Sequence, residues 1–286
     1  PGLTLARISC MSKYSTTDNV RPLPVRSPDV FPVHRGKGII VTGAAGGIGR
    51  AIAELLLAEG ATVIVADLRE DAVAATVKSL GGKSHGVAMD VGSQESIAAG
   101  IAASEAALGR IDGLVNCAAI VRHADPLEIS WDDWRRQFEI NLFGAYEAAR
   151  LVAKHMIATG TRGAIVSIAS EAGKKGHKES LAYSASKAGI ISMTRILSEA
   201  LAAHDINVNC VGPGGVATPM VREVSVAYSG VTSEPPEAIF DKMTSQQLVR
   251  HLQPIEVARV VSFLLGDAAM LVRGQAVNAD AGETPY

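Results

Sequence analysis

Tyr183 and Lys187 are four residues apart, so on a helix their side chains lie on the same face, one turn from each other. A free tyrosine hydroxyl titrates at about pH 10, too high for a base at neutral pH. A lysine charge at this spacing favours the phenolate, as does the N-terminal end of a helix. The pair is suited to taking a proton from a hydroxyl group. Taken alone, such a pair is more often an ordinary surface feature of an amphipathic helix.

A glycine-rich loop at residues 42–49 joins an apolar run to a helical pattern. Glycines at this point let the chain turn tightly, let the backbone approach a pyrophosphate and leave the N–H groups of the helix N-terminus accessible. An ordinary strand-to-helix turn is the alternative, but the strand–loop–helix context favours a nucleotide site. The loop residues expected to contact the nucleotide are Gly43, Ala45, Gly47, Ile48 and Gly49.

Asp67 ends the next apolar run, 18 residues after Gly49. This is close to the spacing at which a carboxylate binds the adenosine ribose hydroxyls of a dinucleotide. The carboxylate would repel a 2′-phosphate, and the glycine loop holds no Lys or Arg to offset it, although Arg69 is two positions on. The sequence therefore favours NAD over NADP. A helix N-cap is the alternative interpretation of Asp67.

Seven short runs rich in valine and isoleucine alternate with helical patterns: residues 38–42, 61–67, 86–90, 111–116, 164–168, 206–211 and 275–279. Continuous apolar strands separated by helices are typical of a parallel sheet buried on both faces. The expected fold class is therefore α/β. It is a doubly wound, seven-stranded parallel sheet (Rossmann fold) with helices on both faces, in a single domain over residues 38–286.

The composition excludes several classes of protein. The 286 residues are 48% hydrophobic and 20% charged, which excludes global disorder. A net charge of −2 gives no basic field for nucleic acid or an anionic membrane, and the longest uncharged stretch, residues 206–221, contains prolines and glycines that exclude a membrane span. The three scattered cysteines, Cys10, Cys117 and Cys210, suggest neither disulfides nor a metal site and suit a cytoplasmic protein.

Residues 1–37 differ from the remainder, since they are rich in proline and carry six Lys or Arg against two Asp or Glu. We expect an extended or partly disordered N-terminal arm. The segment has no apolar core for a signal peptide, and its prolines oppose an amphipathic targeting helix. Met11 is an alternative start of translation.

Together these motifs resemble the short-chain dehydrogenase/reductase family in its single-domain form, over about residues 37 to 283. Each motif is weak alone, but their order and spacing are specific. One departure is Ala119, where the family usually has glycine. The motifs are the loop at residues 42–49, Asp90-Val91, the stretch 116–119, Asn141, Ser170, the Tyr183-x-x-x-Lys187 pair and Pro213-Gly214.

The resemblance implies catalytic roles for four residues. Tyr183 would be the general acid/base, and Ser170, thirteen residues earlier, would hold the substrate oxygen. Lys187 would bind the nicotinamide ribose and lower the pKa of the tyrosine, and Asn141 would anchor a water that links the lysine to solvent. Further cofactor contacts are implied for Asp90 and Val91 at the adenine, Asn116 and Ala118 along the adenosine half, and Pro213, Gly214 and Thr218 at the nicotinamide.

The same resemblance implies a substrate lid over residues 219–251, and Ala172 and His177 are the candidate substrate contacts. The basic cluster at residues 174–178 could attract an acidic substrate, but a solvated turn is the favoured interpretation. The expected function is NAD-dependent hydride transfer between nicotinamide and a secondary alcohol or ketone, with polyols and sugar-like compounds among the candidates. The alternatives are an NADPH-dependent 3-oxoacyl reductase, which Asp67 disfavours, and a non-catalytic nucleotide-binding protein.

The resemblance and the helix pattern also predict an oligomer. In this family two long helices pair with their copies across two-fold axes, and here they would span about residues 131–157 and 182–203. The second helix carries more apolar surface than one buried stripe needs. We therefore expect a homotetramer, with a dimer as the alternative.

Overall fold

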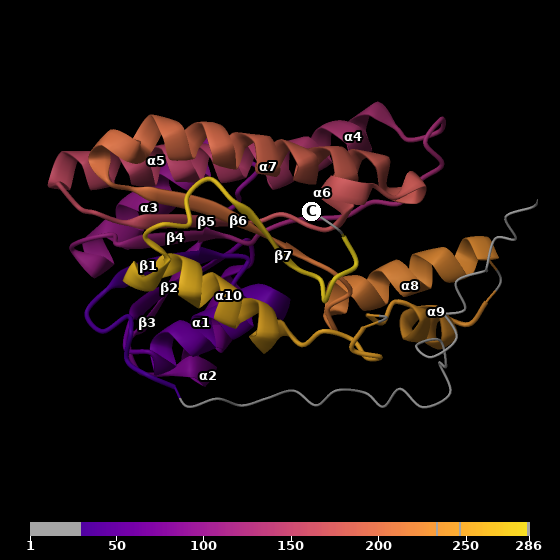
Figure 1. The fold of residues 1–286 in the computed structure, drawn as a ribbon, viewed down its shortest axis with the longest axis horizontal. Coiled ribbons are helices and arrows are strands. Elements are labelled where there is room, and N and C mark those ends of the chain that lie inside the picture. Colours follow the sequence, from indigo (N-terminus) through magenta and orange to yellow (C-terminus); the bar gives the residue numbers. More distant parts are fainter. Residues whose placement is uncertain (1–29, 233, 246, 285–286) are drawn as a thin grey trace, which may run out of the picture.

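The computed structural model describes residues 30–232, 234–245 and 247–284. Within them, seven strands form one parallel sheet in the order β3-β2-β1-β4-β5-β6-β7, so the predicted doubly wound Rossmann fold is confirmed (Figure 1). The strands are β1 (Gly38–Thr42), β2 (Thr62–Asp67), β3 (Ser84–Ala88), β4 (Gly113–Asn116), β5 (Ala164–Ile168), β6 (Asn207–Pro213) and β7 (Ala276–Ala279).

Helices cover both faces of the sheet (Figure 1). One face packs against α1 (Gly47–Ala58), α2 (Glu70–Leu80) and α10 (Pro254–Leu265), and the other against α3 (Gln94–Leu108), α5 (Gly144–Thr159) and α7 (Leu181–Leu201). The shorter helices are α4 (Trp131–Phe138), α6 (Ala172–Lys175), α8 (Pro219–Thr232) and α9 (Pro236–Lys242), with a π-helical turn at Glu139–Phe143 and 3-10 turns at Lys178–Ser180, Ala202–His204 and Asp267–Ala269.

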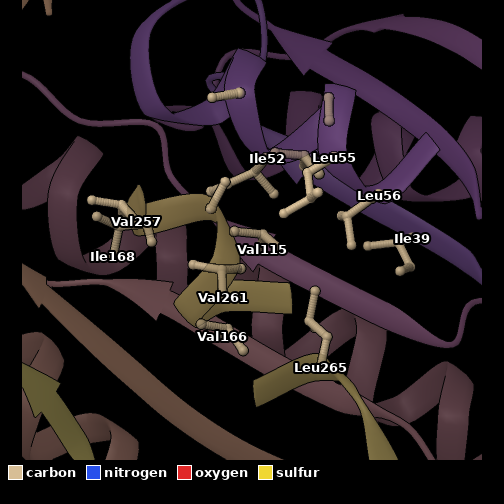
Figure 2. Packing of buried hydrophobic residues seen from close by; sticks show 14 of the residues in the cluster. Ile39, Ile52, Leu55, Leu56, Val115, Val166, Ile168, Val257, Val261 and Leu265 are labelled. Atoms are coloured by element: carbon tan, nitrogen blue, oxygen red, sulfur yellow. The ribbon is translucent and has the colours of Figure 1, made fainter. Parts of the chain in front are cut away.

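Alternating residues of each strand supply the two cores. In β1, Ile39 and Val41 join the core under α1 and α10, whereas Ile40 joins the core under α3 and α5. Figure 2 shows the first core, where Ile52 of α1 and Val261 of α10 lie over the sheet. Both faces of the central strands are thereby buried, which explains why those strands read as continuous apolar runs.

The strand order reverses between β1 and β4, because β2 and β3 extend from one side of β1 and β4 to β7 from the other. The connections after these two strands therefore leave in opposite directions at the carboxyl end of the sheet. Ligands of doubly wound folds bind in the crevice at such a switch point. The site described below lies at this edge.

Several element boundaries differ from the sequence prediction, and two of the differences concern residues of the site. The run predicted at residues 86–90 pairs as Ser84–Ala88, because Asp90 leaves the ladder and its Oδ1 accepts a hydrogen bond of 2.8 Å from the Gly92 nitrogen. The helix predicted over residues 131–157 is divided into α4 and α5 by the π-helical turn. A π turn inserts one residue into the helical ladder and is frequent at functional sites.

Most of the predicted N-terminal arm, residues 1–29, lies outside the described residues. The last part of residues 1–37 is packed against the domain rather than extended away from it. His34 is fully buried and its Nε2 lies 3.1 Å from the Ser262 hydroxyl of α10, and Lys37 pairs with Asp267 at 3.0 Å. His34 and Lys37 therefore contact α10 and the turn that follows it. Among the described residues, no helix combines the length and hydropathy that crossing a bilayer requires.

Candidate active site

The glycine loop joins β1 to α1 at the reversal of strand order. Gly43 has a φ of +66°, and a Cβ added to it would lie 2.8 Å from the Ala118 nitrogen, while a Cβ on Gly49 would lie 2.2 Å from the Gly43 oxygen. These two positions require glycine so that the loop can pack closely on the end of β4. At the N-cap, Gly46 places no side chain over the first N–H groups of α1. These groups can bind a phosphate, so the loop fits a dinucleotide.

A cavity of about 430 Å³ opens beside this loop along the carboxyl ends of the strands. The structure brings most of the predicted site residues to its wall. They are Gly43, Gly47, Ile48, Gly49, Asp67, Asp90, Val91, Ala118, Ser170, Tyr183, Lys187, Pro213, Gly214 and Thr218. This cleft, called the cofactor cavity below, has the backbone approach and the depth along the sheet edge that a dinucleotide requires.

Three predicted residues lie behind the wall of the cofactor cavity. The Ala45 nitrogen donates a hydrogen bond of 3.0 Å to Asp67, and the Asn116 amide donates to the Ala145 oxygen at 3.0 Å. The Asn141 amide holds both main-chain groups of Ile120, at 2.8 and 2.9 Å. These residues position the loops that line the cavity.

Asp67 ends β2 with its carboxylate fixed by two main-chain nitrogens, those of Ala45 and Leu68, at 3.0 and 2.8 Å. The alternative that Asp67 caps the next helix is wrong, because the N-cap of α2 is Arg69, which makes no side-chain cap bond. The carboxylate instead lines the cofactor cavity, where it presents oxygen acceptors. Ribose hydroxyls are suitable donors for such acceptors.

Tyr183 and Lys187 lie one turn apart on α7, with the Lys187 Nζ 5.6 Å from the centre of the tyrosine ring. The Nζ donates a hydrogen bond of 2.7 Å to the Ile168 oxygen. Burial lowers the pKa of Lys187 to about 8 and raises the pKa of Tyr183 to about 12. Burial therefore dominates both pKa values, and it acts against the charged form of each side chain.

Ser170 lies just beyond the end of β5, where its Oγ accepts a hydrogen bond of 3.1 Å from the Ala172 nitrogen. A hydrogen bond to Ser170 also acts on Tyr183, lowering the pKa that burial raises. By contrast, Ser167 is buried within β5 and bonds to Asn116 at 3.3 Å. The serine at the thirteen-residue spacing is therefore the one that meets the tyrosine.

The π-helical turn connects the loop after β4 to α7. Within the turn, the Asn141 amide donates to the Ser186 hydroxyl at 3.1 Å, and that hydroxyl donates to the Tyr183 main-chain oxygen at 2.7 Å. The turn thereby holds the helical segment between Tyr183 and Lys187 in register with the Ile120 loop. Asn141 acts on the geometry of the pair from a buried position.

A second cavity of about 550 Å³, called the substrate cavity below, adjoins the first. Ser170 and Tyr183 line both cavities, and the predicted substrate residues Ala172 and His177 line the second. Residues of the predicted lid form much of the remaining wall. They are Met220, Val221, Val224, Tyr228, Lys242, Met243, Thr244 and Gln247, and they belong to α8, α9 and the segment that follows (Figure 1).

The basic turn before Tyr183 is exposed at Lys175, His177 and Lys178, as the solvated-turn interpretation expects, and its side chains also pair with acids. Glu171 receives a hydrogen bond of 2.8 Å from His177, and Lys175 lies 2.8 Å from the same carboxylate. Lys175 also reaches Glu283 at 3.6 Å, which ties the turn to the C-terminal segment. Glu171 and Glu283 thus offset the charge of Lys175 at this corner of the cavity.

Several lining residues were missed by the sequence reasoning. Arg136 of α4 reaches the cofactor cavity and lies 3.8 Å from Asp90, while His123 and the C-terminal residues 281–283 line the substrate cavity. No spacing rule connects these positions with Tyr183. Residues 281–283 reach the cavity because the segment after β7 folds around Asp280, which accepts a hydrogen bond of 3.0 Å from the Thr284 nitrogen.

The glycine loop, the buried Tyr–Lys pair and the two adjoining cavities define an NAD(P)-dependent oxidoreductase. The model of the short chain dehydrogenase family matches residues 37–228, and the chain belongs to this family. Its members bind NAD(P)H, and this chain is an enzyme that acts on a small alcohol or ketone substrate.

Individual relatives support the assignment. The chain is 37% identical over 250 residues to a 2,5-dichloro-2,5-cyclohexadiene-1,4-diol dehydrogenase of Sphingobium indicum, covering 87% of this chain and 97% of the relative. It is 37% identical over 249 residues to a cis-4-hydroxycyclohexanecarboxylate dehydrogenase of Sinomonas cyclohexanicum, covering 86% and 95%. The crystal structure of an actinorhodin polyketide ketoreductase variant with NADPH superposes with a TM-score of 0.84 at 38% identity, covering 87% of this chain and 98% of that one.

Proposed function

We propose that this chain is an NAD-dependent dehydrogenase that interconverts a small secondary alcohol, borne on a ring or a polyol, with its ketone. The observation that carries the proposal is that Ser170 and Tyr183 line both cavities. A substrate oxygen held by these two hydroxyls would lie where the substrate cavity meets the cofactor cavity. Hydride transfer needs this meeting point, because the reacting carbon must face the cofactor.

The proposed steps assign one task to each side chain. A nicotinamide bound in the cofactor cavity would supply the acceptor for the hydride of the carbinol carbon. Ser170 holds the substrate oxygen, and Tyr183, as phenolate, takes the hydroxyl proton while the carbon–oxygen double bond forms. In the reducing direction Tyr183 returns that proton to the oxygen.

We assign Lys187 the role of stabilising the phenolate form of Tyr183. Burial raises the pKa of Tyr183 to about 12, so a nearby positive charge is required for deprotonation. The Lys187 ammonium, 5.6 Å from the ring centre, supplies such a charge, and its bond to Ile168 keeps it at the cavity wall. We assign its remaining hydrogens to the nicotinamide ribose. We also assign Asn141 the anchoring of a water that carries the proton toward solvent.

The preference for NAD rests on Asp67. Its carboxylate lines the cofactor cavity next to the glycine loop, and a 2′-phosphate at this place would meet a negative charge. Leu68, which also lines the cavity, is apolar and offers no compensating cation. An adenosine ribose with free hydroxyls fits these two side chains better.

The choice of a ring-borne alcohol rests on the relatives and on the cavity wall. The two curated relatives described above are named for alcohols on six-membered rings. In this chain Val121, Val224 and Met220 give the substrate cavity apolar walls beside the polar groups at Ser170 and Tyr183. A compact substrate with an apolar body and few oxygens suits this combination.

An NADPH-dependent 3-oxoacyl reductase is the second candidate, favoured by the similarity to a polyketide ketoreductase that was crystallised with NADPH. Steady-state kinetics separate the two candidates. The purified chain is assayed with ring alcohols, polyols and hydroxyacyl thioesters, each with NAD and NADP. The proposal expects the highest kcat/KM for a ring alcohol or polyol with NAD, and a preference for NADP with a thioester would overturn it.

We further propose a homotetramer as the working assembly and the cytoplasm as its location. Exposed apolar side chains on α5 and α7 support the first proposal. The described cysteines, Cys117 and Cys210, are unpaired, and burial raises the pKa of both thiols, which suits a reducing compartment. Whether the predicted N-terminal arm contributes to either property is tested by its removal.

A further inference from the structure

His123 lies in the segment between β4 and α4 and lines the substrate cavity. Its ring packs edge-on against the Tyr228 ring of α8, with 5.1 Å between the ring centres. Both ring nitrogens are buried, and neither forms a hydrogen bond of ordinary geometry with the described residues, although the main chain of Glu179 lies close enough to act on the pKa of the ring. Burial lowers the pKa of this histidine, so the ring is neutral at pH 7 and carries one N–H donor and one acceptor.

Two other polar groups of this wall, on Tyr228 and His177, have partners. The Tyr228 hydroxyl donates a hydrogen bond of 3.1 Å to Glu179, and the His177 Nε2 bonds to Glu171 at 2.8 Å. Buried polar atoms in native proteins are nearly always paired. A ring that lines the cavity and lacks a well-formed hydrogen bond therefore points to a group that enters the cavity. Because the ring can donate and accept, a hydroxyl or a carbonyl oxygen fits it equally well.

The charges around the cavity indicate that this oxygen is uncharged. Lys175 is held between Glu171 and Glu283, and Lys242 pairs with Glu234. An anionic group in the cavity would therefore have to displace a carboxylate from a lysine that already has one. A neutral hydroxyl or carbonyl has no such competition.

We propose that His123 binds a second, uncharged oxygen of the substrate, distinct from the oxygen held by Ser170 and Tyr183. The enzyme would thereby select diols and hydroxyketones over simple secondary alcohols. This inference rests on the proposed function, since it assumes that the cavity holds an alcohol whose first oxygen lies at Ser170 and Tyr183. A site built to hydrogen-bond an oxygen discriminates strongly against the analogue that lacks it.

The test measures binding separately from turnover. In the Tyr183→Phe enzyme saturated with NAD, calorimetric titration gives the Kd of cis-cyclohexane-1,4-diol and of cyclohexanol. The diol should bind at least about tenfold more tightly. Adding His123→Phe, which retains a ring against Tyr228, should weaken the diol about tenfold and leave cyclohexanol within about twofold. His155→Phe, the same change at a histidine outside both cavities, should alter neither affinity.

Equal affinity for the two alcohols, or an equal loss of both affinities in His123→Phe, would overturn the role of His123. The same comparison with Tyr183 intact should show the kcat/KM ratio of diol to cyclohexanol falling about tenfold in His123→Phe. Selective binding without any NAD reduction would support the oxygen subsite and contradict the proposed reaction. If neither alcohol binds, the ring-alcohol substrate class and this inference both fail.

Discussion

The Asp67 carboxylate accepts a hydrogen bond of 3.0 Å from the main-chain nitrogen of Ala45, so the acid at the end of β2 is fixed to the glycine loop. The carboxylate has little freedom to move aside for a phosphate on the ribose. This contact joins two motifs that the sequence separates by about twenty residues. It makes the cofactor preference a property of a rigid corner of the cavity.

The double change Asp67→Ser and Leu68→Arg should move the enzyme from NAD toward NADP. The serine removes the repulsion, and the arginine adds a charged partner for the 2′-phosphate. The ratio of kcat/KM with NADP to that with NAD should rise about 10- to 100-fold. Leu68→Arg alone is the matched control and should retain a preference for NAD. A wild-type enzyme that already prefers NADP would contradict the role given to Asp67.

Replacing Tyr183 by phenylalanine should abolish turnover while leaving NAD affinity nearly unchanged. The ring still packs in the cavity wall, and only the group that carries the proton is lost. Loss of general acid–base catalysis typically lowers the rate by about 10² to 10⁴-fold. Single-turnover kinetics and a fluorescence titration with NADH measure the two quantities. If the variant retained more than about half of the wild-type kcat, the proton would have another acceptor.

Acid should destabilise the fold through His34. Burial lowers its pKa to about 4, whereas the unfolded residue titrates at about 6.5. Between these values the unfolded chain binds the extra proton, so stability falls as the pH decreases. The loss from pH 7 to pH 5 is about 2 kcal/mol. Glu59, whose pKa burial raises, offsets part of it because the folded state then binds a proton first.

Urea unfolding at pH 7 and pH 5 measures this effect. His34→Gln is the matched variant, since it keeps an N–H donor toward Ser262 but cannot titrate. The difference in unfolding free energy between the two pH values should be smaller in His34→Gln than in the wild type. Equal differences would show that other groups carry the acid sensitivity.

Much of the fold could be predicted from the sequence because its signals are local. The apolar runs of β1 and β5 match the structure residue for residue, since a strand buried on both faces must be continuously apolar. The glycine loop could be placed for a similar reason, because a Cβ at Gly43 or Gly49 would collide with the neighbouring backbone. Such constraints are visible in residue type and spacing.

Other features depend on contacts between distant segments. His34 looked like part of a proline-rich arm, but its partner Ser262 lies 228 positions along the chain. The π-helical turn follows from the bonds between Asn141 and Ile120, and no residue pattern marks it. The lack of a well-formed hydrogen bond at the His123 ring depends on what surrounds it in space. None of these could be inferred from spacing alone.

The proposed homotetramer is supported by two groups of exposed apolar side chains. On α5 and α7, Tyr146, Ile157 and Ile196 are 45%, 40% and 65% exposed. Met270 and Leu271, in the segment between α10 and β7, are 56% and 89% exposed. Isolated apolar side chains on a surface are normal, but rows of them along paired helices are typical of interfaces between copies.

Two separate interfaces, each on a two-fold axis, generate a tetramer with dihedral symmetry. Light scattering at micromolar protein should therefore give about four times the 29.7 kDa of one chain. Ile196→Asp should leave a dimer that is held by the interface at Met270 and Leu271. Leu271→Asp should leave a dimer that is held by the interface of α5 and α7. In each variant a buried unpaired charge opposes association. Glu199→Gln, an exposed change on α7 that adds no charge, should leave the tetramer intact. A wild-type mass of one chain would contradict the assembly. A wild-type dimer that Ile196→Asp does not disrupt would show that only the interface at Met270 and Leu271 forms.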